Sequence, residues 1–222
     1  VIRYTQKPYQ SQYSYDVQLP YDLEFFSLIN GESLKIKDSL ILARPPIMNP
    51  NGSAIAYYRM DKRIWEIAFI DSSLFGETIV KIVEVPMSKP VWDEEHDSPS
   101  YPYPYGSPGW LSSGDFVVYD AYDIWRFNHK TRELVALTNS YGRSTESRMR
   151  VLNLEPEFDE DLEVKKGIDN SDGTITIQTF HEPSKSSGIL MLDLASKETE
   201  TLSFGNFKNS RFRRARYANS LL

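Results

Sequence analysis

The sequence repeats itself at an offset of about 60 residues. Residues 46–57, PIMNPNGSAIAY, align with residues 108–119, PGWLSSGDFVVY, at a constant offset of 62, and each segment is a turn followed by a β-prone run. The following RIW of 63–65 aligns with DIW of 123–125 at an offset of 60, so the intervening hairpin is two residues shorter in the second copy. Such a period, with several strands in each copy, is typical of β-propellers.

A third copy lies further along the chain. Residues 173–180 read as its inner strand, 181–188 as a turn, 189–192 as the next strand and 198–204 as the strand that closes it. Near the start, residues 23–28 and 33–36 form a hairpin about the Asn-Gly pair of 29–32, which is the strongest short hairpin signal.

The central copy, residues 105–143, is the clearest. A Gly/Pro/Ser turn leads to Trp110, and strands are predicted over 116–119, 124–127 and 134–137, separated by polar corners. Three short antiparallel strands in succession form a meander, which is the building unit of a propeller blade.

These patterns predict an all-β fold made of β-propeller blades, each an antiparallel meander. We expect a partial ring with about three to four blades, because propellers close with roughly four to eight. Residues 1–20 read as a leading loop and 155–163 as an acidic linker. The predicted blade segments are 16–41, 42–100, 101–150, 156–205 and 206–222, the last being the start of a further blade.

Composition narrows the possible partners. The net charge of −6 argues against nucleic acid, because phosphate contacts need a basic face, and the arginines of 211–216 read as a solvated cluster. No apolar run approaches the roughly 18 residues of a membrane span, and there is no cysteine. The chain opens at Val1 within sequence that already reads as folded, so we expect the native start to be missing.

Several motifs carry a family resemblance. YGSPGW, DFVVYDAYDIWRFN and LTNSYGR within 105–143, with TITIQTFHEPSKSSGILML at 174–192, resemble the N-terminal propeller of bacterial prolyl oligopeptidase family serine peptidases of the Bacteroidetes type. In that group a Gly-Trp turn, a Tyr-Asp-x-Tyr-Asp-Ile-Trp hairpin and an Asn-x-x-Gly-Arg end recur in one blade. A Phe-x-x-x-x-Lys-x-x-Gly turn recurs in the next.

The resemblance implies a non-catalytic propeller that gates the access of peptides to an α/β-hydrolase domain, which is absent from this sequence. It also implies peptide substrates reached through the parent enzyme, contact with that hydrolase domain and a periplasmic or extracytoplasmic location. The nearest approaches to a Gly-x-Ser-x-Gly elbow, at 31–35 and 142–146, lack the final glycine. We therefore assign no catalytic, metal-ligating or cofactor-binding residue. An open ring exposes apolar faces, so we also expect self-association.

The remaining candidates each have two interpretations. Asp120 and Asp123 suit Asx-type turns, or paired acid–base chemistry on glycans. The run of 92–97, WDEEHD, suits an exposed acidic loop or a cation site. His129 and His181 read as surface residues. The tryptophans that fall at repeat-related positions read as packing residues, and these are Trp65, Trp110 and Trp125.

One stretch could present rings to a ligand. In residues 101–105, YPYPY, alternating proline and tyrosine suit an extended segment, which is either a covering loop or a recognition surface formed by Tyr101, Tyr103 and Tyr105. The alternatives to a peptidase propeller are a stand-alone propeller that binds protein or glycan ligands, and a glycan-active propeller. Only the peptidase propeller accounts for the ordered motifs.

Overall fold

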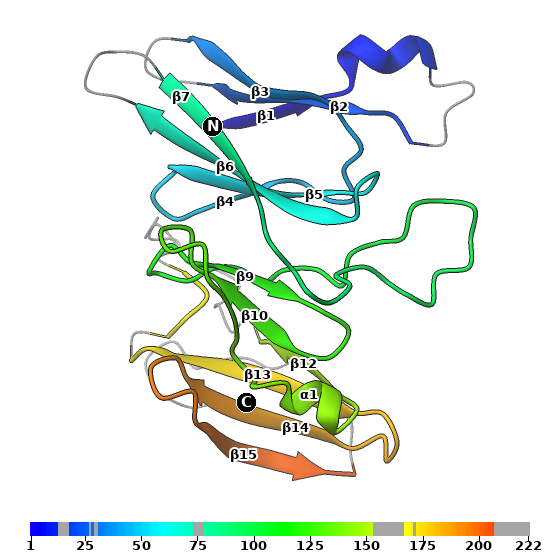
Figure 1. Cartoon of the computed structure of the whole chain (residues 1–222), viewed down its shortest axis with the longest axis vertical. Coiled ribbons are helices and arrows are strands. Elements are labelled where there is room, and N and C mark those ends of the chain that lie inside the picture. Colours follow the sequence, from blue (N-terminus) through cyan, green and yellow to red (C-terminus); the bar gives the residue numbers. More distant parts are fainter. Residues whose placement is uncertain are drawn as a thin grey trace, which may run out of the picture. The chain divides into compact units, whose positions relative to one another are not determined.

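The computed structural model describes residues 1–12, 18–26, 28, 31–72, 78–152, 167–170 and 172–206. Its described residues form four antiparallel sheets of three or four strands, with only two short helices (Figure 1). The chain divides into two compact units, Val1–Pro104 and Tyr105–Leu222, and each unit contains two of the sheets. The all-β fold of blade-like meanders is therefore confirmed.

The first sheet has the order β1-β2-β3, with β1 at Ile2–Thr5, β2 at Tyr21–Phe26 and β3 at Ser33–Leu40. The prediction of a leading loop over 1–20 was wrong, because β1 pairs with β2 and the 3-10 helix η1 follows at Lys7–Gln12. β1 has only four residues, none of them fully buried, and lies at the edge of its sheet, so the sequence signal for it is short.

The second sheet has the order β4-β5-β6-β7 and completes the first unit. Its strands are β4 at Ile47–Met48, β5 at Ala54–Arg59, β6 at Ile64–Ser72 and β7 at Thr78–Glu84. Every residue of β5 is buried. The sheets of this unit share a core of Leu23, Ile36, Leu40, Ile55, Tyr57, Ala68 and Ile70.

The third sheet has the order β11-β10-β9-β8 and opens the second unit. Its strands are β8 at Gly109–Trp110, β9 at Phe116–Tyr119, β10 at Ile124–Phe127 and β11 at Leu134–Ala136. The central meander is confirmed by the pairing of β9 with β10 and of β10 with β11. The single turn of helix α1, Tyr141–Ser144, follows β11.

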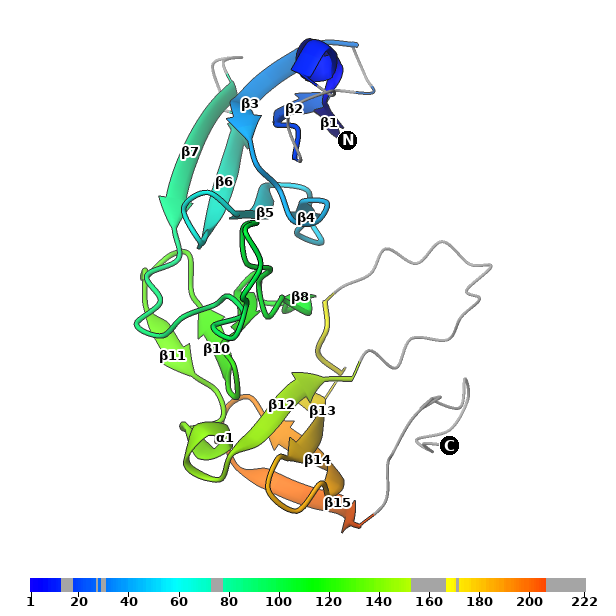
Figure 2. The same ribbon diagram turned by 90° about the vertical axis from the view of Figure 1, so that its right-hand side faces the viewer.

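The fourth sheet has the order β12-β13-β14-β15 (Figure 2). Its strands are β12 at Ser147–Val151, β13 at Thr174–His181, β14 at Ser187–Asp193 and β15 at Thr199–Gly205. Pairing with β13 places β12 in this sheet, whereas the sequence boundary left residues 147–150 in the preceding blade. The sheets of this unit share a core of Leu111, Val117, Tyr119, Ile124, Leu137, Met149, Ile175, Ile177, Leu190 and Leu192.

The repeat seen in the sequence is a repeat of one turn. In the second, third and fourth sheets, a glycine N–H donates to the carbonyl three residues earlier, over 2.9–3.0 Å, just before the second strand begins. All three glycines have positive φ, from 75° to 86°, which favours glycine. They are Gly52, Gly114 and Gly173. The offset of 62 also relates β4 to β8 and the start of β5 to the start of β9.

Candidate functional site

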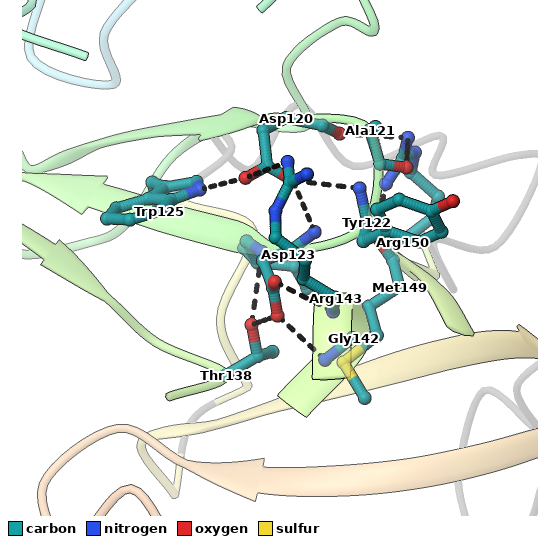
Figure 3. Close-up of polar contacts among 11 residues, drawn as sticks. Asp120, Ala121, Tyr122, Asp123, Trp125, Thr138, Gly142, Arg143, Met149 and Arg150 are labelled. Atoms are coloured by element: carbon teal, nitrogen blue, oxygen red, sulfur yellow. Dashed lines mark hydrogen bonds and ion pairs between the residues drawn. The ribbon is translucent and has the colours of Figure 1, made fainter. Parts of the chain in front are cut away.

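The corner between β9 and β10 is organised by the buried carboxylate of Asp120 (Figure 3). Its Oδ1 accepts the backbone N–H groups of Tyr122 and Asp123, at 2.8 and 2.6 Å. Its Oδ2 accepts the indole N–H of Trp125 at 3.1 Å and pairs with the Arg143 guanidinium at 3.3 Å. Asp120 therefore closes an Asx turn, and its ion pair with Arg143 also connects this corner to the Asn-x-x-Gly-Arg motif.

Asp123, also buried, binds the segment that follows β11. Its Oδ1 accepts the Thr138 hydroxyl at 2.7 Å and the Gly142 N–H at 2.9 Å, and its Oδ2 accepts the Arg143 N–H at 3.0 Å. These donors come from the start and middle of the segment that contains α1. One carboxylate thus joins the hairpin motif of 119–125 to the Asn-x-x-Gly-Arg motif of 139–143 in this chain.

Gly142 occupies a place where no side chain fits. A Cβ added there would lie 2.8 Å from the carbonyl oxygens of Ser147 and Tyr122, and 2.9 Å from Oδ1 of Asp123. Real Cβ atoms do not approach backbone oxygens so closely. The glycine of the motif is therefore required by close packing.

We expect Gly142→Ala to lower the free energy of unfolding by about 2 kcal/mol, because backbone must shift to admit the methyl group. Urea unfolding followed by tryptophan fluorescence measures the change. A loss below about 0.5 kcal/mol, the size typical of a surface substitution, would contradict this packing argument.

Strand β12, the first strand of the fourth sheet, forms hydrogen bonds to the same β9–β10 corner. The Met149 N–H donates to the Tyr122 carbonyl at 2.8 Å. The Arg150 guanidinium donates to the carbonyls of Asp120 and Ala121, at 3.1 and 3.0 Å. Because these bonds run between the third and fourth sheets, they fix the position of one blade on the next.

Two tyrosine rings complete the surroundings of Arg150. Its guanidinium carbon lies 4.6 Å from the ring centroid of Tyr119 and 6.0 Å from that of Tyr105. The Tyr119 hydroxyl accepts the Val151 N–H at 3.0 Å. Burial lowers the pKa of Arg150 from its usual value, opposed by Tyr119 and Asp120, and a guanidinium still keeps its charge. Burial also raises the pKa of Tyr119 to about 12.

This pKa predicts a loss of stability in alkali. The neutral phenol of Tyr119 is favoured in the folded chain, whereas an unfolded tyrosine ionises near pH 10. The protonated phenol contributes on the order of 2 kcal/mol to the free energy of unfolding. This contribution is complete below pH 10 and declines as the pH rises toward about 12. The pKa values of buried Tyr57 and Tyr58 are raised too, so they add to the decline.

We expect Tyr119→Phe to make the unfolding free energy fall less steeply with pH. The difference in slope should correspond to about one proton. The check is the unfolding free energy of both proteins at several values between pH 9 and 11.5. Equal pH slopes for the two would contradict the assignment, whatever their stabilities at pH 7.

The arrangement suits structure more than catalysis. All four oxygens of Asp120 and Asp123 accept hydrogen bonds from the chain itself. The Asx-turn interpretation is confirmed for Asp120, whereas the donors to Asp123 lie 15–20 residues further along the chain. Both carboxylates are buried and hydrogen-bonded within the chain, which gives the acid–base interpretation no support. Sequence reasoning missed Thr138, Arg150 and the role of Tyr119, because each bonds to a residue at least 15 positions away.

The Phe-x-x-x-x-Lys-x-x-Gly motif of residues 180–188 also has a structural explanation. At Gly188 an added Cβ would lie 2.8–2.9 Å from atoms of Phe204, Ser203 and Thr179. Lys185 has a φ of 59°, and its ammonium lies 5.8 Å from the Phe180 ring centroid. The Phe-x-x-x-x-Lys-x-x-Gly motif therefore encodes the β13–β14 turn.

The other predicted residues lie apart from this corner. Asp93, Glu94, Glu95 and Asp97 are exposed, as expected of an acidic loop. Among the described residues, no group of three or more His, Cys, Asp or Glu side chains is arranged so that it could hold a metal ion. His129 and His181 are half-buried, and the His181 Nδ1 lies 2.6 Å from the Ser184 hydroxyl. Trp65 and Trp110 are buried packing residues, whereas Trp125 is half-buried.

The three tyrosines proposed as a ligand surface have different surroundings. Tyr101 and Tyr103 are exposed by 41% and 52%, in the first unit. Tyr105 is half-buried beside Arg150 in the second unit. The predicted linker of 155–163 and the predicted blade start lie outside the described residues, apart from Asn206.

No helix among the described residues is both long and apolar enough to span a membrane. No protein-family model matches the chain, and no curated protein matches it.

The solved structures that are similar to the chain have low sequence identity to it. TolB from Acinetobacter baumannii is 16% identical with a TM-score of 0.41, over 87% of this chain and 39% of that one. A puromycin hydrolase is 11% identical with a TM-score of 0.46, over 83% and 26%. A Mycobacterium tuberculosis puromycin-hydrolyzing peptidase is 14% identical with a TM-score of 0.33, over 89% and 36%. The chain thus spans well under half of each of these proteins, and its fold class rests on the strand pairing of its own four sheets.

Proposed function

We propose that this chain is a non-catalytic β-propeller segment of a prolyl oligopeptidase-like serine peptidase, which controls the access of peptides to a hydrolase domain outside this sequence. The observation that carries the proposal is the Asp120–Asp123 corner. There the ordered motifs that resemble this family are joined by hydrogen bonds into one scaffold. Motifs of this kind specify how blades fit together and supply no reacting group.

The two serines nearest to an elbow pattern support the same assignment. Ser33 begins strand β3, and Ser144 ends α1, where its hydroxyl donates to the Tyr141 carbonyl at 3.0 Å. A nucleophile elbow instead places the serine between a strand and the helix that follows it. Neither serine therefore has the surroundings that activate a nucleophile. The peptidase location we propose is extracytoplasmic, following the same resemblance.

The test is the reading frame downstream of Leu222 together with the protein that it encodes. We expect a Gly-x-Ser-x-Gly elbow followed by an aspartate and a histidine, and labelling of that serine by a fluorophosphonate probe. Removing the propeller from that protein should speed cleavage of large polypeptides relative to short peptides. A frame that ends after further blades would overturn the proposal and favour a stand-alone binding propeller.

A further inference from the structure

The loop between β7 and β8 holds an ordered hairpin outside the sheets. Trp92 pairs with Pro104 in an antiparallel bridge, and the Asp93 N–H donates to the Tyr103 carbonyl at 2.8 Å. Just after this pairing, the Glu95 N–H donates to the Asp93 carboxylate at 3.2 Å. A surface on this hairpin is therefore organised before any ligand arrives, which lowers the entropy cost of binding.

In the second arm of the hairpin, residues 101–104, exposed and buried side chains alternate. Pro102 and Pro104 are buried, whereas Tyr101 and Tyr103 between them are exposed by 41% and 52%. This alternation is that of an extended segment, in which successive side chains point to opposite sides. The two tyrosine rings therefore share the solvent side of the arm.

The opposite arm and the tip add negative charge. Asp93, Glu95 and Asp97 are exposed, and residues 90–108 contain no lysine or arginine. A positive ligand would gain attraction from the carboxylates and from the faces of the tyrosine rings. The same hairpin already shows this chemistry once, because the Arg63 guanidinium lies 5.6 Å from the ring centroid of Trp92.

We propose that this hairpin is a docking surface for a cationic peptide segment, with Tyr101 and Tyr103 contacting lysine or arginine side chains and the carboxylates supplying attraction. The proposal deepens the proposed function in naming the class of peptide that the propeller attracts, and it rests on that function only for taking a peptide as the ligand. Tyr105 has no part in the surface, because it packs beside Arg150.

The experiment is fluorescence anisotropy with the 222-residue chain and a fluorescein-labelled peptide of alternating lysine and alanine. The matched probe has glutamate in place of lysine. We expect binding of the lysine peptide that weakens as salt is added, since exposed charges are screened. The glutamate peptide should not bind.

Substitutions in the hairpin test whether the lysine peptide binds there. Tyr101→Ala with Tyr103→Ala should weaken binding about tenfold, and Asp93→Asn with Glu95→Gln should do the same. Tyr101→Phe should retain binding, because the ring and not the hydroxyl makes the contact. The controls are Tyr141→Ala, which removes a tyrosine exposed by 56%, and Glu133→Gln, which neutralises an exposed glutamate. Neither control should change binding, and thermal melts by circular dichroism check that each variant folds.

Three results would overturn the proposal: no binding of the lysine peptide, equal weakening by the controls, or competition by a neutral oligosaccharide, which would indicate a glycan surface. These results concern the chain alone. The peptidase assignment depends instead on the downstream reading frame, so either can fail without the other.

Discussion

Replacing Asp123 with alanine should lower the free energy of unfolding of the second unit by about 3–5 kcal/mol, because buried donors lose their acceptor and each costs about 1–3 kcal/mol. The donors are the Thr138 hydroxyl and the N–H groups of Gly142 and Arg143. Urea unfolding followed by tryptophan fluorescence should show the midpoint falling. Asp123→Asn keeps one acceptor oxygen, so its loss should be smaller.

The matched control for this change is Asp193→Ala. Asp193 also accepts hydrogen bonds from two backbone N–H groups and one hydroxyl, those of Ala195 and Ser196, but it does so at an exposed turn. Water can replace the lost acceptor there, so its loss should be a small fraction of that at Asp123. Equal losses at the two positions would show that burial of the Asp123 corner is not what makes it costly.

Replacing Gly167 with alanine should cost about 3–5 kcal/mol, because a steric clash adds to backbone strain. An added Cβ would lie 2.3 Å from the backbone nitrogen of Ser112 and 2.5 Å from Oδ1 of Asp169. That aspartate accepts the Ser112 N–H at 2.6 Å and also its hydroxyl, so the methyl group would push apart the contact between the third sheet and the segment before β13. Unfolding in urea, measured as above, gives the size of the effect.

Gly173→Ala separates the two contributions. Gly173 has a φ of +80°, but an added Cβ would meet no atom within 4 Å. Its substitution therefore incurs strain alone, about 1–2 kcal/mol. If both alanine variants lose the same stability, the close approach of Gly167 to Ser112 contributes nothing to the cost.

The sequence predicted well the strands that are β-prone and bounded by turn residues, and poorly the strands that lack this local signal. Residues 116–119 and 124–127 were expected as strands and match β9 and β10, since each is a β-prone run bounded by turn residues. The strand β8 is only Gly109–Trp110, which reads as a turn. The strand β12 ends at Val151 and β13 begins only at Thr174, so nothing local associates β12 with its sheet.

The sequence predicted the role of Asp120 at the candidate site but not that of Asp123. Asp at both ends of a polar corner predicts Asx turns, and the structure confirms one at Asp120. That Asp123 binds the Thr138 and Gly142 region could not be predicted, because this contact depends on how the chain returns to the corner after β11.

By itself, the sequence determined the blade repeat, the turn glycines and the hairpins, because alternation, β propensity and positive φ are local properties of a few neighbouring residues. Only the tertiary structure decided which carboxylates are structural, which tyrosines face solvent and how Arg150 ties β12 to the preceding sheet. These outcomes depend on burial and on partners distant in sequence, and both are set when sheets stack to cover their apolar faces.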